Sequence, residues 1–115
     1  MPIDSLQSLE IIEIMENFLS AKRPPEDIRD QLDIGYRIDN QSIFIFEIRP
    51  RYQSPEEKVE LDVAKTTYVK SKDLWKVYWK RGDLKWYPYD PQPTVKNLNA
   101  FARLVEEDSH ACFWG

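Results

Sequence analysis

The sequence predicts an α+β protein with an N-terminal helix, a mostly antiparallel sheet of about five strands, and a C-terminal helix with an apolar tail. Near both ends, apolar residues recur every three to four positions, as in amphipathic helices. Between them, apolar and polar residues alternate, as in half-buried strands. The length of 115 residues suits one domain, and no linker or repeat divides it, so we expect residues 1–115 to fold as a single domain.

The first predicted helix covers residues 5–22. Its apolar stripe recurs at helical spacing and is widened by neighbouring apolar positions: Leu6, Leu9, Ile12, Met15 and Leu19, with Ile11, Ile14 and Phe18 beside them. Asp4, with Gln7 three residues later, has the form of a capping box. Pro24 and Pro25 end the helix because the residue before a proline avoids the helical conformation.

The strands are predicted to begin at Gly35, after one or two short helical turns in residues 25–32. Two alternating segments flank residues 39–42, which favour a hairpin turn. Pro50 is expected to end the second strand because proline cannot donate a hydrogen bond to a neighbouring strand. The polar stretch 51–62 also contains a proline, and we therefore expect it to form a loop.

Further strands are predicted at about residues 63–69, 74–80 and 84–89, where alternation resumes and prolines then end it. Asn97 is a good cap for a closing helix. That helix would place four apolar residues on one side: Leu98, Phe101, Ala102 and Val105.

The register of the last hairpin is predicted from its tryptophans. Pairing Trp79 with Leu84 puts the apolar side chains of both strands on one face, with Trp79 buried. Gly82 would supply the positive φ that the turn needs. A three-residue turn would mix the faces by bringing Trp86 beside Tyr78, so we reject it at this stage.

The net charge of −4 conceals an uneven distribution. Residues 1–62 carry 7 basic and 14 acidic side chains, a balance of −7, and residues 90–115 carry 2 and 4, a balance of −2. Residues 63–89 carry 7 basic side chains against 2 acidic ones, a balance of +5, together with 7 of the 15 aromatic residues. Such a concentration of one charge bears on partners rather than on fold.

This basic block predicts a face on which lysines and tyrosines alternate across two strands. The candidate binding residues are Lys76, Tyr78, Lys80, Lys85 and Tyr87. We expect a non-enzymatic protein that acts by binding, through this Lys/Tyr face or the Trp-rich hairpin, to a partner as yet unknown. An acidic protein surface would suit the charge. Single-stranded nucleic acid is the alternative, because tyrosines stack on bases and lysines follow phosphates. The simplest explanation is a solvated sheet face.

Two other groups of residues are weaker candidate sites. The sequence leads us to expect no catalytic residue, metal or cofactor. Asp83 and Lys85, with Glu47 on another strand, would suit a metal-dependent hydrolase if the fold brought them together. His110 and Cys112 provide too few ligands for zinc, and nothing in the sequence orients them for nucleophilic catalysis.

The tail and the location follow from composition. The final aromatic residues are expected to pack on the sheet or the first helix, through Phe113 or Trp114, with Cys112 shielded.

No apolar run approaches the ~20 residues of a spanning helix. The acidic start does not resemble a signal peptide. One cysteine excludes an internal disulfide, so we expect a cytoplasmic protein without a membrane partner.

Several short motifs, in their order and spacing, give the chain a family resemblance. From about residue 24 to 115 the sequence resembles the small bacterial family catalogued as domain of unknown function 3024. The resemblance rests on Arg49-Pro50, Lys65 with Tyr68, Trp75-x-x-Tyr78-Trp79, Arg81-x-Asp83-Leu84-Lys85-Trp86 and Cys112-Phe113-x-Gly115. It implies a compact, stand-alone bacterial protein and carries no activity. Relatives often have His at the position of Tyr87 and Gly at that of Ala111, so chemistry ascribed to that histidine could not operate here.

Overall fold

The computed structural model describes residues 5–114, and their side chains from residue 7 onward. It confirms the predicted α+β class, with one helix on either side of the strands in sequence. The elements are α1 (Ser5–Lys22), the 3-10 turn η1 (Glu26–Ile28), β1 (Asp33–Asp39), β2 (Ser42–Arg51), β3 (Ser54–Val69), β4 (Leu74–Lys80), β5 (Trp86–Pro88), β6 (Thr94–Val95) and α2 (Leu98–Glu107). The predicted capping box at Asp4 lies outside the described residues.

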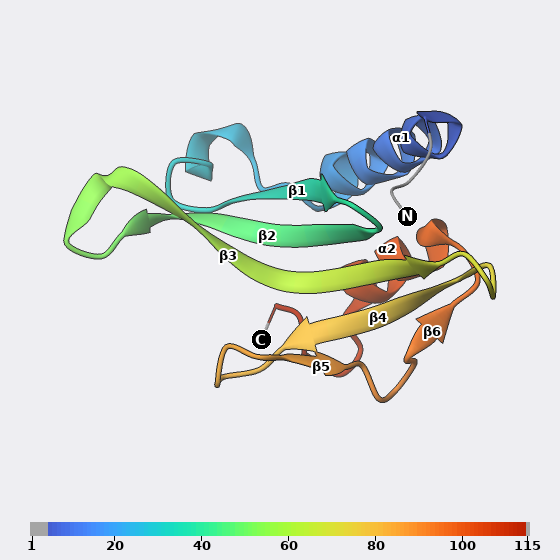
Figure 1. Cartoon of the computed structure of the whole chain (residues 1–115). Coiled ribbons are helices and arrows are strands. Elements are labelled where there is room, and N and C mark those ends of the chain that lie inside the picture. Colours follow the sequence, from blue (N-terminus) through green and yellow to red (C-terminus); the bar gives the residue numbers. More distant parts are fainter. Residues whose placement is uncertain (1–4, 115) are drawn as a thin grey trace.

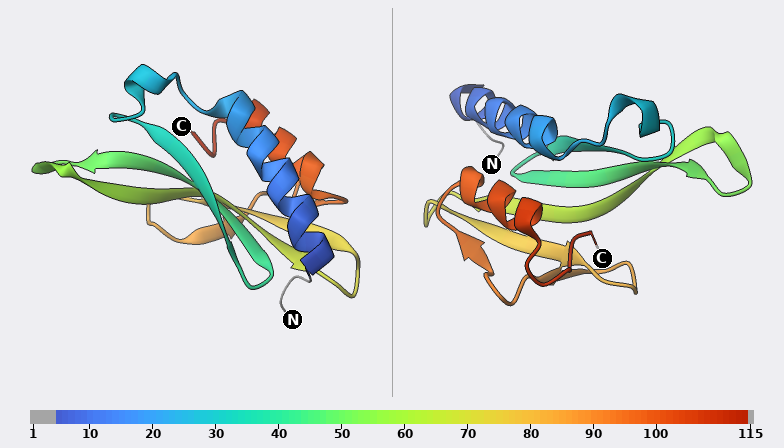
Figure 2. Two further views of the ribbon diagram at one scale, coloured as in Figure 1. Left: turned by 90° about the horizontal axis from the view of Figure 1, so that it is seen from above. Right: turned by 180° about the vertical axis from the view of Figure 1, so that it is seen from behind.

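The strands form one antiparallel sheet in which neighbours in sequence are neighbours in space. The order is β1-β2-β3-β4-β5, and the short β6 pairs with β4 beside β5 (Figure 1). Both helices lie on the same face of this sheet and contact each other (Figure 2). The opposite face is not covered by a helix, and we call it the open face.

Helix α1 has the predicted bounds but buries a different stripe. Ile11, Met15 and Phe18 are at most 3% exposed, whereas Leu9 and Ile12 are 66% and 43% exposed. The prediction that Leu9 and Ile12 lie in the core is therefore wrong. Apolar residues extend around much of the helix, so its periodicity alone does not choose between adjacent stripes, and packing against α2 makes the choice.

Helix α2 is capped as the sequence predicts. Asn97 has an extended backbone, and its side-chain oxygen accepts a hydrogen bond of 2.9 Å from the amide of Ala100. The four predicted apolar residues are all buried against α1 and the sheet: Leu98, Phe101, Ala102 and Val105. This side of the sheet therefore holds the core.

The expected loop after β2 is instead a long hairpin, so that prediction is wrong. Strand β2 continues through Pro50 to Arg51, and β3 begins at Ser54. Strand β1 pairs with β2 only as far as Ile48, which leaves one edge of β2 open at Pro50. Proline is tolerated at such an edge because no strand there requires its missing amide.

A β-bulge in this hairpin decides which side chains reach the open face. Ile45 pairs with Ala64 and Phe46 pairs with Asp62, so Val63 is the extra residue. The bulge shifts the alternation of β3 by one residue. As a result, both Asp62 and Lys65 point to the open face.

The β4–β5 hairpin has a three-residue turn, the turn length that the sequence analysis rejected, although Trp86 lies directly opposite Lys80 rather than Tyr78. Trp79 pairs with Tyr87, and Lys80 pairs with Trp86. The amide of Arg81 donates to the carbonyl of Lys85 (3.1 Å), which encloses a three-residue turn at residues 82–84. The proposed pairing of Trp79 with Leu84 is therefore wrong.

The turn takes this register because Asp83 holds it together. One carboxylate oxygen of Asp83 accepts the amide of Lys85 at 3.0 Å, and the other accepts the hydroxyl of Tyr87. Leu84, rather than Gly82, takes the left-handed conformation, with φ at 64°. The predicted positive φ at Gly82 is wrong, because this turn requires it at its third position.

This register reverses the expected roles of the tryptophans. Trp86 lies on the open face beside Tyr78, and Trp79 on the helix side is only half-buried. Leu84 is 75% exposed. The indole in the core is that of Trp75, which is 5% exposed and packs on Tyr68 with ring centroids 5.0 Å apart.

Replacing Leu84 by glycine is expected to raise the free energy of unfolding by about 1 kcal/mol, because an L-residue in the left-handed region is strained. The exposed side chain contributes little packing that could be lost. Chemical denaturation would measure the change. Glycine at the neighbouring exposed Lys85, which has no positive φ, is the control and should not stabilise the protein. Equal effects of the two substitutions would contradict strain at Leu84.

As far as Trp114, the C-terminal tail packs back on the protein, and the predicted burial of Phe113 is confirmed. Asp108 ends α2 in a left-handed conformation, and its carboxylate accepts the backbone amides of Cys112, Phe113 and Trp114 at 2.9 to 3.1 Å. The ring of Phe113 is buried against Tyr89, with centroids 4.9 Å apart. Cys112 is half-buried, and burial raises the pKa of its thiol.

Candidate functional site

The structure brings three of the five predicted binding residues together on one face. Lys76, Tyr78 and Lys80 point to the open face of β4, and Lys85 lies exposed in the β4–β5 turn. Tyr87 points to the helix side, because it pairs with Trp79. The expectation that Tyr87 joins the Lys/Tyr face is therefore wrong, since the observed register reverses its direction.

Tyr87 takes part in the turn instead. Its hydroxyl donates to Asp83, which raises the pKa of Tyr87 and lowers that of Asp83. The guanidinium of Arg81 lies 4.8 Å from the centroid of the Tyr87 ring and 5.5 Å from that of Trp79. These contacts make Tyr87 a structural part of the hairpin.

A single row of side chains crosses the open face. The pairings run from Arg37 on β1 through Phe44, Lys65 and Tyr78 to Pro88 on β5. Directly opposed residues of antiparallel strands point to the same side. The register therefore places a lysine between two aromatic rings at the centre of the sheet.

Trp86 completes this group, which we call the Lys65 cluster: Phe44, Lys65, Tyr78 and Trp86. The Lys65 Nζ atom lies 5.6, 5.2 and 5.7 Å from the centroids of the Phe44, Tyr78 and Trp86 rings. Phe44 and Trp86 come from β2 and β5, yet their centroids are only 6.0 Å apart, in an edge-on arrangement. The indole therefore reaches across the face over Lys65.

The Lys65 cluster is stabilised by cation–π attraction. An ammonium within about 6 Å of a ring centroid is attracted to the ring face by roughly 0.5–1 kcal/mol at an exposed site. Lys80 makes a similar contact with Trp86, at 5.5 Å. Because aromatic rings accept no conventional hydrogen bond here, these contacts leave the ammonium N–H donors available to an anion.

The charge on the open face is neutralised at one end only. Arg37 forms two hydrogen bonds with Asp62, at 2.7 and 2.9 Å, which raise the pKa of the guanidinium, and it stacks on Phe44 at 4.3 Å. Within the part of the chain that the structure describes, no ion pair involves Lys65, Lys76 or Lys80. The uncompensated positive charge is therefore concentrated around Tyr78.

A small apolar pocket of about 200 Å³ adjoins Tyr78. Strands β5 and β6 pair with different parts of the same edge of β4, and the pocket lies where the chain passes from one to the other beside Val77. The amide of Val77 donates a hydrogen bond of 2.9 Å to the carbonyl of Pro93 in this connection. Pro88 and Pro93 flank the pocket, and Lys76 lies at its side. The open face thus combines aromatic rings, lysines and a shallow apolar recess.

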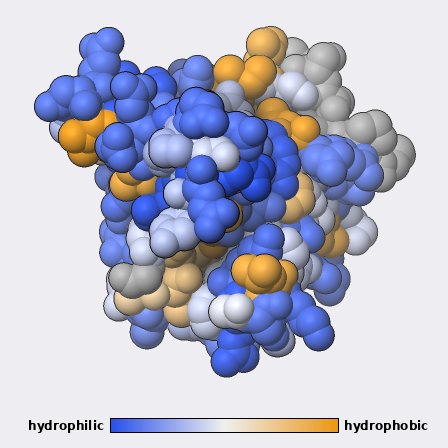
Figure 3. Space-filling model, turned by 90° about the vertical axis from the view of Figure 1, so that its left-hand side faces the viewer, coloured by the Kyte–Doolittle hydropathy of each residue, from blue (hydrophilic) through white to orange (hydrophobic). Residues whose placement is uncertain are grey.

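The end of the molecule that carries the β2–β3 and β4–β5 connections is mostly hydrophilic (Figure 3). Its hydrophobic atoms lie in small patches that are separated from one another. Large contiguous apolar patches are typical of stable protein interfaces. This view of the surface shows no such patch.

Sequence reasoning missed three members of the Lys65 cluster: Phe44, Lys65 and Trp86. Phe44 and Lys65 come from strands that the analysis predicted but did not align with β4. Trp86 was assigned to the opposite face by the predicted pairing of Trp79 with Leu84, which the structure contradicts. A pairing of β3 with β4 through their alternating patterns would have placed Lys65 beside Tyr78.

The other candidate residues occupy separate environments. Glu47 pairs with Arg49 at 3.2 Å on the helix side, whereas the Asp83 carboxylate is taken by the β4–β5 turn. Among the residues that the structure describes, no group of three His, Cys, Asp or Glu side chains could hold a metal ion. The Cys112 thiol points to the carbonyl of His110 at 3.7 Å, and its raised pKa disfavours a thiolate at neutral pH.

Comparison with known proteins identifies the family. Residues 3–115 match the family described as Domain of unknown function (DUF3024), so the chain belongs to it. No curated protein and no solved structure matches. No helix in the described part of the chain is long and apolar enough to span a membrane.

Proposed function

We propose that this family member is a non-enzymatic binding protein whose open face holds an extended anionic ligand, single-stranded nucleic acid. One observation supports this above others. The Lys65 cluster gathers three aromatic rings from three strands on a face without a helix. The lysines around them form no ion pair with any residue that the structure describes. Aromatic platforms flanked by cations are typical of proteins that bind single strands.

The geometry suits both parts of a nucleotide. The Tyr78 and Trp86 rings are half-buried and offer their remaining surface to a base. The ammonium groups of the neighbouring lysines would contact phosphates. An acidic protein surface would neutralise the same positive charges, but it would not require a row of aromatic rings. Binding to such a surface is therefore the second hypothesis, and the experiment below distinguishes the two.

We also infer that the protein is bacterial, as the family resemblance implies, and cytoplasmic, as the composition predicts. The single cysteine supports this inference, because disulfide pairing within the chain plays no part in its stability. Fractionation of a native host, with blotting of each fraction, would test the location.

Binding is expected to be dependent on salt. We would titrate fluorescein-labelled oligo-dT and oligo-U of about 15 nucleotides and follow fluorescence anisotropy. If three lysines contact phosphates, log K should fall with log salt with a slope of roughly −2, because each phosphate of a single strand contributes about 0.7. A double-stranded oligomer should bind more weakly, since its bases cannot reach the rings.

Two variants separate stacking from charge. Trp86→Ala is expected to weaken binding roughly 5- to 150-fold, which corresponds to the 1–3 kcal/mol found for the loss of one stacked base. The double substitution of Lys76 and Lys80 by glutamine should reduce the salt slope by about 1.4, or 0.7 for each lost contact. Matched controls are Tyr52→Ala, a 93% exposed aromatic at the β2–β3 tip, and Lys96→Gln, an exposed lysine outside the open face strands.

The proposal is wrong if no single-stranded oligonucleotide binds even at a low salt concentration of about 50 mM, where electrostatic binding is strongest. It is also wrong if Tyr52→Ala weakens binding as much as Trp86→Ala does. If an acidic polypeptide such as polyglutamate binds as tightly as the oligonucleotides do, and if Trp86→Ala does not weaken its binding, the hypothesis of an acidic protein partner is favoured.

A further inference from the structure

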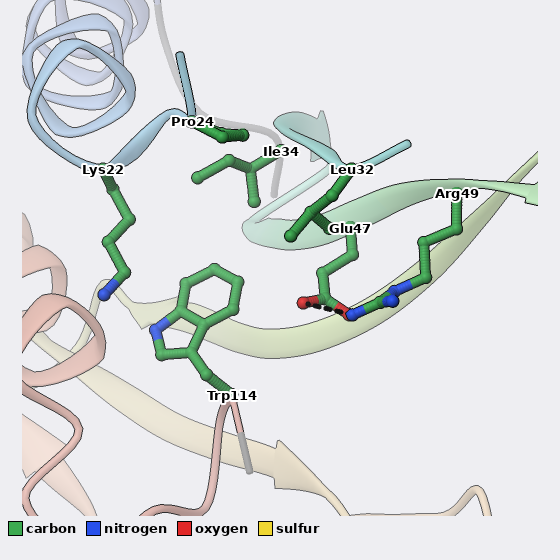
Figure 4. Close-up of a pocket in the computed structure, with 7 residues that line it drawn as sticks. All are labelled: Lys22, Pro24, Leu32, Ile34, Glu47, Arg49 and Trp114. Atoms are coloured by element: carbon green, nitrogen blue, oxygen red, sulfur yellow. Dashed lines mark hydrogen bonds and ion pairs between the residues drawn. The ribbon is translucent and has the colours of Figure 1, made fainter. Parts of the chain in front are cut away.

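A second site lies on the other side of the sheet. A pocket of about 330 Å³ opens where the end of α1, the linker to β1, strand β2 and the C-terminal tail meet (Figure 4). This volume falls at the lower end of the range for small-molecule sites. The pocket lies on the helix side and shares no residue with the Lys65 cluster, so it is independent of the proposed function.

The walls of this pocket, which we call the Trp114 pocket, are mainly apolar. Pro24, Leu32 and Ile34 form one side, and the indole of Trp114 forms the other. Figure 4 shows the indole standing between the side chains of Lys22 and Glu47. A flat ring facing aliphatic side chains is a suitable slot for a planar group.

Hydrogen bonds outside the cavity hold these walls in place. The Trp114 indole N–H donates to the carbonyl of Val105 at 2.7 Å, and its backbone amide donates to Asp108. The linker is held by two hydrogen bonds from Arg23 to Asp33, at 2.7 and 2.6 Å, and Arg23 lowers the pKa of that carboxyl. A site whose walls are fixed before binding loses little conformational entropy when a ligand enters.

The polar groups of the pocket leave one positive charge uncompensated. Glu47 and Arg49 neutralise each other, although their contacts of 3.2 and 3.3 Å are long for a charge-assisted pair. The Lys22 Nζ atom lies 5.4 Å from the centroid of Trp114 and donates one weak hydrogen bond of 3.4 Å to a backbone carbonyl. An ammonium has three donors, so Lys22 has donors available for a ligand.

We propose that the Trp114 pocket binds a small monocarboxylate with a planar aromatic body. The ring lies between the Trp114 indole and the aliphatic wall, and the carboxylate accepts hydrogen bonds from the Lys22 ammonium. The single uncompensated charge matches a monoanion rather than a phosphate ester, which carries more charge. The guanidinium of Arg49 has N–H groups that Glu47 does not use and provides a second donor at the rim.

The test follows the indole N–H signal of Trp114 in a two-dimensional nitrogen–proton NMR spectrum. The signal is assigned as the one that disappears in Trp114→Phe. The probes are phenylacetate, benzoate and indole-3-acetate, each titrated into the full chain. We expect at least one to shift this signal saturably, with a dissociation constant of about 1 mM or lower. Phenylacetamide, a neutral analogue of the same shape, should bind roughly tenfold more weakly.

Lys22→Gln removes the charge and keeps most of the side-chain length. It is expected to weaken carboxylate binding about tenfold while leaving phenylacetamide binding unchanged. Lys96→Gln, the matched control, should leave both unchanged. Thermal denaturation of each variant confirms that it is folded.

Three outcomes would overturn the proposal. One is that none of the three carboxylates shifts the Trp114 signal. Another is that phenylacetamide binds as tightly as phenylacetate. The last is that Lys22→Gln and Lys96→Gln bind alike. Because none of these measurements involves a nucleic acid, failure here is distinct from failure of the open face.

Discussion

Asp108→Ala is expected to lower the free energy of unfolding by about 3–5 kcal/mol and to detach the tail that follows α2. One carboxylate accepts three consecutive backbone amides. A hydrogen bond to a charged group contributes a net stabilisation of roughly 1.5–3 kcal/mol, and the three share one half-buried carboxylate, so their sum is less than three times that value. The residue also sits at φ 42°, where aspartate is tolerated far better than alanine. Both effects act in the same direction.

Chemical denaturation measures the loss, and quenching of tryptophan fluorescence by acrylamide reports whether Trp114 has become accessible. Asp73→Ala is the matched control, because Asp73 also has a positive φ but accepts only the Tyr68 hydroxyl in the hydrogen bonds observed. Its effect should be smaller, about 1–2 kcal/mol. Equal losses in the two variants would mean that the Asp108 hydrogen bonds contribute little.

Trp75→Ala is expected to destabilise the protein by about 3–5 kcal/mol, the usual range for an aromatic residue truncated in a core. Its indole is 5% exposed and joins the core cluster formed by both helices. The loss approaches the total stability of a small domain, so part of the population should be unfolded at 37 °C.

Trp79→Ala provides an internal comparison on the same strand and the same face. Trp79 is half-buried and lies under the Arg81 guanidinium, so its truncation should cost less than that of Trp75. Urea denaturation of both variants, followed by circular dichroism, gives the two free energies. If Trp79→Ala were the more damaging, the observed register of the β4–β5 hairpin would be contradicted.

The fold was predictable where local patterns decide it. The bounds of α1 and β4, the Asn97 cap and the hairpin at residues 39–42 depend on periodicity, prolines and turn residues close in sequence. The long β2–β3 hairpin could not be predicted in this way. Its prolines are tolerated because they lie at a sheet edge, and which strands form an edge is known only once all the strands are paired. The strand content of residues 51–62 is thus a tertiary effect.

The candidate site was only partly predictable, for a related reason. Three residues on β4 were identified because alternation along one strand needs no knowledge of its neighbours. The assignment of Trp86 failed because a turn can shift by one residue when a side chain such as Asp83 supplies hydrogen bonds that the backbone alone lacks. Lys65 and Phe44 could be found only with the pairing of β2, β3 and β4.

The order of the strands has a consequence for how the chain folds. Each of β1 to β5 pairs with the strand next to it in sequence, so successive hairpins can form early with little loop-closure entropy. The core must wait, because α1 and α2 meet only when residues as far apart as Lys22 and Glu106, 84 positions, come together. During synthesis the apolar face of the meander is therefore exposed until both helices pack on it, and aggregation through this face is the main hazard for the nascent chain.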